Sequence, residues 1–352
     1  MQAPRNRSSK QPLWIIVLVT MVCVSLIGAY IYPPRRYAAC YFFASTVCHP
    51  FGQNVQPVRK RVYTDEEIAS RTVINDILKM PQVQSKNPKV AFMFLTPGSL
   101  PFEKLWEKFF LGHEDRYSIY VHASKRKPEH QSSLFMEREI RSDKVDWGQI
   151  SMVDAERRLL ASALQDPDNQ HFVLLSDSFD DPGPHGTGRY STHMGPEIEK
   201  EDWRKGAQWF TMKRQHALIV IADNLYYSKF KQFCMPGVDG HNCYADEHYL
   251  PTFFHLVDPG GISNWSVTHV DWSEGKWHPK MYRAQDVNYE LLKNITSIDE
   301  STHVSSDEKK VRTKQPCLWN GVGRPCYLFA RKFFPETLGN LLEIFSNYTE
   351  AS

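Results

Sequence analysis

The feature that most constrains the fold is a series of short apolar runs that alternate with helix-like segments. The runs are VAFMFL at residues 90–95, YSIYVH at 117–122 and HFVLL at 171–175, with helical patterns at 102–111 and 152–164 between them. Short, mainly apolar runs are typical of strands buried on both faces. Strands that alternate with helices form parallel sheets. We therefore expect an α/β fold with a mostly parallel sheet and helices on both of its faces.

Further elements are expected toward the C-terminus. Residues 203–210 are strand-like, 214–222 and 246–254 are helical, 266–272 form a short strand, and 335–345 form a terminal helix. The polar run at 302–314 is predicted to be a surface loop. Ligands of parallel α/β sheets bind at the carboxyl ends of the strands. A nucleotide site is therefore expected at the carboxyl ends of the predicted strands.

A charge-free segment at residues 13–32 precedes this region. About 20 residues at about 1.5 Å each span a bilayer core of about 30 Å. The short N-terminus carries Arg5, Arg7 and Lys10, which favours an orientation with this end in the cytosol. A cleaved signal peptide is the alternative, but the run is long for one and PPRR at 33–36 is a poor cleavage site. We expect a tail at 1–12, a transmembrane helix at 13–32, a stem at 33–88 and a luminal domain at 89–352. Within the stem, residues 64–80 are expected to be helical, because Thr64 can cap a segment that begins with three acidic residues.

Sequence signals after the anchor agree with a secretory compartment. Three glycosylation sequons begin at Asn264, Asn294 and Asn347. Six cysteines lie outside the anchor, an even number that suits disulfides. Proximity suggests the pairs Cys234–Cys243 and Cys317–Cys326, although six cysteines allow fifteen pairings and each could instead be a buried thiol.

The formal net charge is only +2, and no basic stripe interleaves with aromatic residues. Nucleic-acid binding proteins usually show a clustered positive surface. Nucleic acid is therefore not an expected partner.

Two short segments contain residues suited to group transfer. Glu247 stands at the head of an apolar helical segment, and Arg331 and Lys332 lie among aromatics in LFARKFF at 328–334. A carboxylate can deprotonate an acceptor hydroxyl, and cations can stabilise a departing diphosphate. This combination suits the transfer of a sugar from a nucleotide. The alternatives are a carboxylate favoured by a helix N-terminus and solvated basic side chains.

A metal site is a weaker interpretation of the acidic residues. Asp246, Glu247 and His248 match no zinc spacing, since adjacent helical residues point in different directions. Asp166-Pro-Asp168 precedes a predicted strand, where a polar turn is the simpler reading. We expect no metal, with cations neutralising phosphate charge instead.

Several other residues could contact a saccharide. Arg189 follows a glycine-rich loop, and Lys205 precedes Gly206. Both are candidate acceptor contacts. The tryptophans could stack on sugar rings, although core packing is the usual role of this residue; those considered are Trp203, Trp209, Trp272 and Trp277. Of these, Trp209 is the candidate on the acceptor side.

An ordered series of motifs from Lys89 to the C-terminus indicates a family. The motifs are KVAFMFLTPG at 89–98, GHEDRYSIYVHA at 112–123, DAERRLLA at 154–161, WRKGAQWF at 203–210, YADEHYLPT at 244–252, VDWS at 270–273 and LFARKF at 328–333. The chain resembles the plant branch of the core-2/I-branching glycosyltransferases, which are related to β-1,6-N-acetylglucosaminyltransferases. The resemblance implies a GT-A-like fold, a type II Golgi anchor, and metal-independent, inverting transfer from a UDP-sugar to a glycan, with no cofactor.

Site residues follow from the same resemblance, position by position. Glu247 would be the catalytic base, and Lys332, with Arg324 or Arg331, would bind the diphosphate. The uridine would lie between Thr96 and the segment His122-Ala123. Animal relatives carry an aspartate where Ala123 stands, so the donor sugar stays open.

The chain departs from the family pattern after Ser178. Relatives continue with a turn, a helix and a strand, whereas here SDS at 176–178 leads directly into FDDPG at 179–183. A parallel crossover needs about a dozen residues or more. The expectation is a shortened variant with part of the sheet uncovered. A catalytically disabled family member and a carbohydrate-binding module therefore remain alternatives to the active transferase.

Overall fold

The structure is a computed structural model, which describes Met21 and residues 61–81, 85–176, 187–238, 241–263, 266–276, 279–304, 312–319 and 321–350. Chain contacts divide the protein into Met1–Val62 and Tyr63–Ser352, and the fold below is that of the second unit. Apart from Met21, the predicted anchor lies outside the described residues, as does the junction at 177–178. Within the described parts of the chain, no helix has the length and apolar composition needed to span a bilayer.

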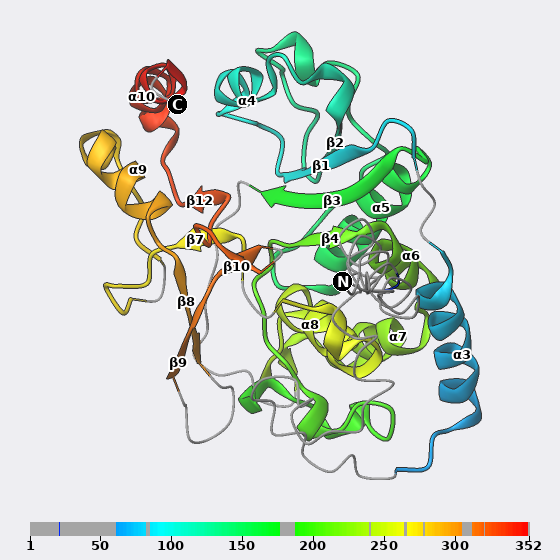
Figure 1. The fold of residues 1–352 in the computed structure, drawn as a ribbon. Helices are drawn as coiled ribbons and strands as arrows, with labels where there is room; N and C mark the ends of the chain where they lie inside the picture. Colours follow the sequence, from blue (N-terminus) through cyan, green and yellow to red (C-terminus); the bar gives the residue numbers. More distant parts are fainter. Residues whose placement is uncertain are drawn as a thin grey trace, which may run out of the picture. The chain divides into compact units, whose positions relative to one another are not determined.

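The central sheet has four strands in the order β2-β1-β3-β4 (Figure 1). The strands are β1 Lys89–Thr96, β2 Tyr117–Ala123, β3 Asn169–Ser176 and β4 Thr211–Lys213. β1 runs parallel to both β2 and β3, and β4 runs antiparallel to β3. Thr96 pairs with Ala123, so β1 and β2 end side by side. The mostly parallel sheet expected from the sequence is confirmed.

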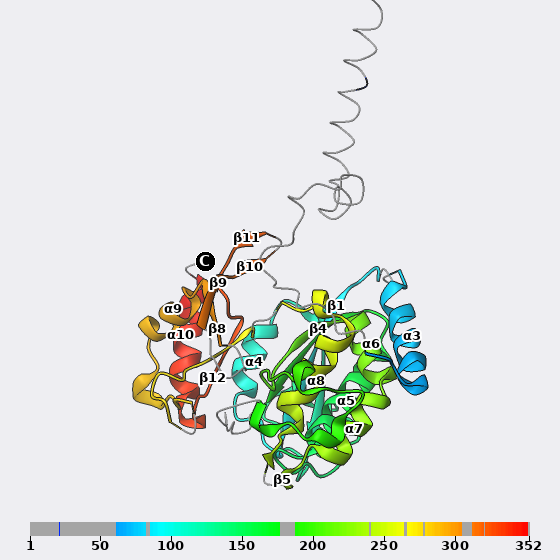
Figure 2. The same cartoon turned by 90° about the horizontal axis from the view of Figure 1, so that it is seen from below.

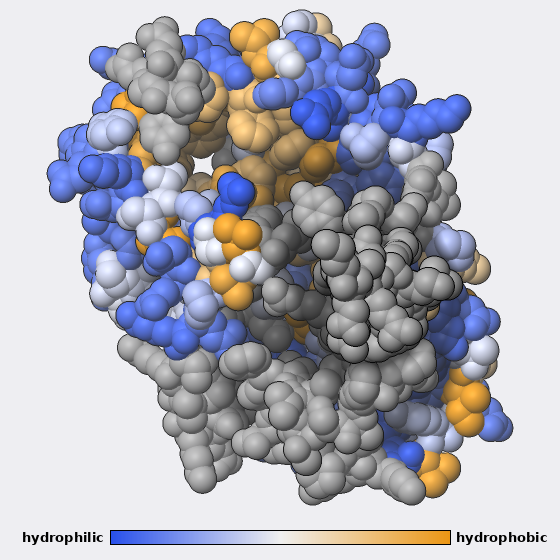
Figure 3. Space-filling view, in the orientation of Figure 1, coloured by the Kyte–Doolittle hydropathy of each residue, from blue (hydrophilic) through white to orange (hydrophobic). Residues whose placement is uncertain are grey.

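Helices cover both faces of this sheet because β1 buries alternate side chains on opposite sides. Ala91, Met93 and Leu95 join a large core with the helices α5 Ile150–Leu164, α6 Arg214–Ala222, α7 Leu225–Phe233 and α8 Ala245–Val257. Phe92 and Phe94 join a second core on the other face with α4 Glu103–Phe110. Apolar residues gather around α4 in the space-filling view (Figure 3).

The helix α3, Asp65–Lys79, begins at a Thr64 cap, as its sequence indicates. It belongs to the folded unit rather than to a separate stem. The Arg71 guanidinium donates to the Leu256 carbonyl at 3.1 Å, and the Tyr226 hydroxyl donates to the buried Glu67 carboxylate at 3.3 Å. The predicted stem at 33–88 therefore extends too far. The many charged residues of α3 suggested a segment outside the domain, but an amphipathic helix can bury one face against it.

The C-terminal region adds short strands and two helices around a small third core (Figure 2). Its elements are β7 Thr268–Val270, α9 Tyr289–Thr296, β8 Glu300–Val304, β9 Arg312–Pro316, β10 Leu318–Trp319, β11 Val322–Gly323, β12 Phe329–Arg331 and α10 Leu338–Glu350. β7 and β12 pair in parallel. The predicted surface loop at 302–314 is wrong at both ends, because β8 and β9 form an antiparallel hairpin whose polar side chains concealed the strand pattern.

A hairpin of β5 Pro236–Val238 and β6 His241–Asn242 precedes α8. The disulfide Cys234–Cys243 closes this hairpin, and Cys317–Cys326 closes the β10–β11 region. Both pairings suggested by sequence proximity are confirmed. Cys40 and Cys48 lie outside the described residues.

The free edge of β3 has a partner despite the shortened sequence. Residues 171–173 pair with β4, and the Leu174 amide donates to the Phe210 carbonyl at 3.0 Å. The edge at His171–Leu174 is thus not left uncovered. The predicted strand at 203–210 is misplaced, since the strand is Thr211–Lys213; the aromatic run is buried against helices, with Trp203 stacked on Phe230.

Candidate active site

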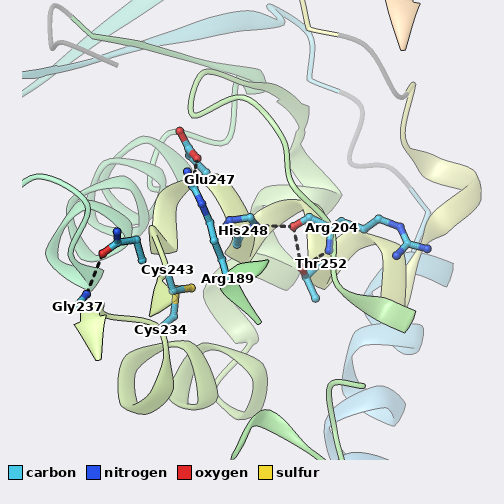
Figure 4. Close-up of a disulfide and its surroundings, with 9 residues drawn as sticks. Arg189, Arg204, Cys234, Gly237, Cys243, Glu247, His248 and Thr252 are labelled. Atoms are coloured by element: carbon cyan, nitrogen blue, oxygen red, sulfur yellow. Dashed lines mark hydrogen bonds and ion pairs between the residues drawn. A yellow bond between two sulfur atoms is a disulfide. The ribbon is translucent and has the colours of Figure 1, made fainter. Parts of the chain in front are cut away.

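Glu247 lies in the first turn of α8, and its side chain is only 8% exposed. Its amide donates to the carbonyl of Tyr244, the N-cap residue of the helix, at 3.2 Å. The Cys234–Cys243 disulfide immediately precedes Tyr244 and fixes the chain entering α8 (Figure 4). The carboxylate of Glu247 is therefore held on a rigid element.

Two cations converge on one oxygen of this carboxylate. Arg189 Nη1 lies 2.8 Å and Lys205 Nζ 3.3 Å from Glu247 Oε2. The Arg189 guanidinium carbon also lies 4.5 Å from the centroid of the Tyr244 ring, and Figure 4 shows the Arg189 side chain reaching Glu247. Neighbouring positive charges favour the ionised form of a carboxylate, which is the form a general base needs. The structure thus brings Arg189 and Lys205, two candidate acceptor contacts, together with Glu247, the candidate base.

Lys205 reaches Glu247 because Pro251 interrupts the hydrogen bonding of α8. Pro251 stands inside the helix and has no amide hydrogen, so the Glu247 carbonyl four residues earlier loses its helical donor. The Gly206 amide donates to that carbonyl at 2.9 Å instead. A Cβ on Gly206 would lie 2.6 Å from Pro251 Cγ, so only glycine fits this close approach. The spacing of Glu247 and Pro251 was the sequence signal for this contact.

A buried acidic cluster lies behind the base. Gln208 Nε2 donates a short hydrogen bond to Asp246 Oδ2. Glu156 of α5 is 1% exposed, and neither of its carboxyl oxygens has a hydrogen-bond partner within the described residues. Burial raises the pKa of Glu156 well above its usual value, and the charge of Asp246 raises it further. Glu156 is therefore held as a neutral acid. Its only sequence signal was an acidic residue among the buried apolar positions of α5.

Replacing Glu156 with glutamine should flatten the pH dependence of stability. An acid with a higher pKa in the folded than in the unfolded chain binds more protons when folded, so stability is lost as pH rises above the unfolded pKa. Glu156→Gln keeps the shape of the side chain but removes the titratable carboxyl group. Between pH 5 and 8 its free energy of unfolding should decline less than that of the wild type, by at most about 1.4 kcal/mol per pH unit. Urea unfolding at several pH values measures this, with the exposed Glu290→Gln expected to follow the wild-type curve; parallel curves for all three proteins would contradict the assignment.

His248 follows Glu247 but has a structural role. Its pKa is lowered to about 3, mainly by burial, and the charges of Arg189 and Lys205 contribute in the same direction. Its Nδ1–H donates to the Arg204 carbonyl at 2.9 Å, and its ring stacks on Trp203 with centroids 4.7 Å apart. His248 is therefore neutral and fixes the segment that leads to Lys205. Across the described residues, no three His, Cys, Asp or Glu side chains gather in a way that could hold a metal ion.

The predicted diphosphate clamp begins at the end of β12. Arg331 and Lys332 are each 8% exposed, and the Lys332 carbonyl accepts from the Tyr282 amide at 2.8 Å. The Arg331 guanidinium lies over Trp209, 4.8 Å from the ring centroid. Trp209, a candidate for the acceptor side, is thus placed against this cation. Arg324 is exposed in the Cys317–Cys326 loop, where its amide donates to the Cys317 carbonyl at 3.0 Å.

One dipeptide contacts the segments that carry the predicted base and the predicted clamp. Gln208 contacts Asp246, the neighbour of Glu247, whereas Trp209 contacts Arg331. Asp246 of α8 and Arg331 of β12 therefore contact adjacent residues, although the two elements are far apart in sequence.

A basic pocket of about 430 Å³ lies where β2 ends. It is lined by Ala123, Ser124, Lys125, Arg126, Lys127, Ser142, Asp143 and Lys144. The neighbouring loop after β1 is tied to it, since the Ser124 amide donates to the Thr96 carbonyl at 2.8 Å. The Thr96 hydroxyl donates to the Ser99 carbonyl at 2.6 Å. The uridine-side residues Thr96 and Ala123 thus lie beside one another at a positively charged hollow.

His122 contacts the segment around Asp143 that lines this pocket. It is fully buried, and its Nε2 lies 3.0 Å from Arg158 Nη1 and accepts from the Asp143 amide at 3.3 Å. Burial lowers the pKa of His122 to about 4, and the charge of Arg158 acts in the same direction. The neutral ring therefore binds the segment containing Asp143 to the end of β2.

Of the remaining predicted positions, the structure describes the side chains of Asn294 and Trp272. Asn294 is exposed on α9 and accessible to modification. Asn264 and Trp277 lie outside the described residues, and the side chain of Asn347 is likewise not described. Trp272 is 38% exposed after β7.

An α/β fold that holds a carboxylate and buried cations at one site is a framework for transfer to or from a phosphorylated sugar. The profile of the Core-2/I-Branching enzyme family matches residues 90–178 and 176–296. The chain belongs to this family and is a glycosyltransferase, which acts on a sugar donor and a glycan acceptor. The two matched pieces meet at residues 176–178, where the sequence departs from the family pattern.

A named relative extends this result over most of the chain. The protein is 34% identical to "Glycosyltransferase BC10" of Oryza sativa subsp. japonica over 301 residues, which cover 70% of this chain and 74% of the relative. The predicted membership of the plant branch is confirmed.

Proposed function

We propose that this protein transfers a sugar, of the N-acetylglucosamine type, from a UDP-sugar to a glycan hydroxyl with inversion and without a metal ion. The observation that supports it is that Gln208 contacts Asp246, which precedes Glu247, while Trp209 contacts Arg331, which precedes Lys332. One base and one cationic clamp meet the needs of a single displacement.

In this mechanism Glu247 accepts the proton of the acceptor hydroxyl. The hydroxyl oxygen attacks the anomeric carbon as the bond from that carbon to the diphosphate oxygen breaks. The electron pair remains on UDP, where Arg331 and Lys332 stabilise the added negative charge. Attack from the face opposite the leaving group inverts the anomeric centre.

Arg189 and Lys205 hold the base and border the acceptor position. Both bind Oε2 of Glu247, which fixes the plane of the carboxylate. Lys205 is 24% exposed and can also donate to an acceptor oxygen. Their common contact with Glu247 supports the acceptor-side role that the sequence suggested for them.

The nucleotide would occupy the hollow at the ends of β1 and β2. Lys125, Arg126 and Lys144 give it a positive field, and ligands of parallel α/β sheets bind at this edge. Ala123 offers no side-chain hydrogen bond, so uridine would be held by main-chain groups and neighbouring side chains. The uncharged run at 13–32 supports a proposed type II placement in the Golgi membrane.

Transfer is tested with the full-length protein purified in detergent. Radiolabelled UDP-N-acetylglucosamine, UDP-galactose and UDP-xylose are each supplied with a panel of glycan acceptors, and both transfer and donor hydrolysis are recorded. The altered junction at residues 176–178 favours one second candidate, a disabled relative. UDP binding without turnover would establish that candidate, and glycan binding without UDP binding would indicate a carbohydrate-binding protein.

A chelator should leave the activity intact. If Arg331 and Lys332 neutralise the diphosphate, transfer in excess EDTA should stay within about twofold of the untreated rate, because no ion takes part in stabilising the leaving group. Initial rates with EDTA, and with added Mn²⁺ or Mg²⁺, measure this. A loss that Mn²⁺ restores would contradict the metal-independent mechanism.

A further inference from the structure

The segment Gln208-Trp209 is buried although it belongs to no helix or strand. Gln208 is 2% and Trp209 4% exposed. The next residue, Phe210, accepts from the Leu174 amide at 3.0 Å, which ties the segment to the edge of β3. The dipeptide is therefore a fixed part of the sheet edge rather than a loose connection.

The two side chains contact different parts of the site. Gln208 donates to Asp246, whose neighbour Glu247 is the base, so the amide holds the first turn of α8. Trp209 lies under the guanidinium of Arg331 at the end of β12. One backbone segment thus touches both halves of the site.

The contact between Trp209 and Arg331 is a cation–π interaction between two buried side chains. A tryptophan face attracts a guanidinium, and the attraction grows when the pair is shielded from water. Here the ring is 4% and the cation 8% exposed. A planar guanidinium must also present the correct edge to a phosphate to donate two hydrogen bonds. A ring face beneath the cation fixes that plane.

We infer that Gln208 and Trp209 are positioning residues that set the distance and orientation between the base and the leaving-group clamp. Trp209 orients Arg331 toward the diphosphate, and Gln208 orients the helix turn that carries Glu247. This inference rests on the proposed function. It explains how residues of α8 and β12, which are far apart in the sequence, would keep a fixed distance and orientation.

The test separates donor binding from turnover in the full-length protein. Trp209→Leu should raise the Kd for UDP, and the KM for the donor, about 10-fold, since it removes the ring face under Arg331. Trp209→Phe keeps a face and should stay within about threefold of the wild type. Gln208→Leu should lower kcat about 10-fold with an unchanged Kd for UDP, since it acts only on the base side.

Trp203→Leu is the matched control, because Trp203 is also buried but stacks on Phe230 and His248 rather than on Arg331. It should lower the melting temperature and leave the Kd for UDP unchanged. Trp209→Met replaces Trp209→Leu if the latter does not fold.

The outcomes distinguish this inference from the function on which it rests. Wild-type protein that binds no UDP overturns the proposed function and the inference together. Wild-type protein that binds UDP, with Trp209→Leu binding equally well or Trp209→Phe losing as much as Trp209→Leu, overturns the inference alone. A loss confined to Trp209→Leu, with Trp209→Phe and Trp203→Leu near the wild-type Kd, supports it.

Discussion

Glu247→Gln should lower the rate of sugar transfer by about 10²–10⁴-fold, the usual contribution of a positioned general base. Glutamine keeps the length and planar shape of the side chain but has no basic oxygen. It can still accept hydrogen bonds from Arg189 and Lys205, which lie 2.8 and 3.3 Å from Oε2 in the wild type. The folded structure should therefore persist while proton transfer from the acceptor fails.

The kinetic pattern separates loss of the base from loss of binding. In Glu247→Gln, kcat should fall, and the Kd for UDP should stay within about threefold, because the clamp is on another element. Rates over a series of acceptor concentrations and calorimetric titration with UDP give both quantities. A variant that transfers at more than a tenth of the wild-type rate would contradict the role of Glu247.

A second glutamate provides the control for charge removal. Glu197 is also buried and pairs with Lys229 of α7 at 2.6 Å. Glu197→Gln removes the negative partner of this lysine, whose side chain is 20% exposed, and should cost stability because the lysine charge loses its compensation. Its transfer rate should stay near that of the wild type. Equal losses in both variants would show that the effect in Glu247→Gln comes from folding.

The elements that could be predicted from the sequence are those whose pattern is local. The buried run at 90–95 identified β1, the helix at 214–222 coincides with α6, and the Thr64 cap identified the start of α3. The hairpin of β8 and β9 was missed because its polar side chains carry no strand signal; its strands are fixed by their pairing across residues 300–316. Helix α7 was not among the expected elements, although its buried residues Tyr226 and Phe230 stand at helical spacing.

The site divides in the same way. Glu247 and Lys332 could be proposed as base and clamp from the motifs that surround them, and these roles stay predictions. The convergence of Arg189 and Lys205 on Glu247 could not, because it joins residues up to 58 positions apart through folding. The same holds for Trp209, whose neighbour Arg331 comes from β12, and for Glu156, whose neutral state depends on its burial against Asp246. Pairings of this kind depend on tertiary structure, which no local pattern specifies.

Lys332→Met should lower kcat/KM for the donor by about 10²–10³-fold, the scale seen when one group that stabilises developing charge is removed. Lys332 follows β12 directly and is 8% exposed, so its ammonium lies in a site with little water. There a charge interacts more strongly with a departing diphosphate than it would at the surface. Methionine fills a similar volume and removes the charge alone.

Lys332→Arg and Lys314→Met complete the experiment. Arginine keeps the charge but not the compact shape, and it should recover part of the lost rate. Lys314 is 72% exposed on β9 and pairs weakly with Glu300 at 3.8 Å, so Lys314→Met should leave transfer unchanged. Donor kinetics and UDP titrations on the three variants measure the effect. If the charge of Lys332 stabilises the leaving group, kcat should fall more than UDP affinity, because charge accumulates on the diphosphate only as the bond breaks; equal losses in both would instead make Lys332 a residue of ground-state binding.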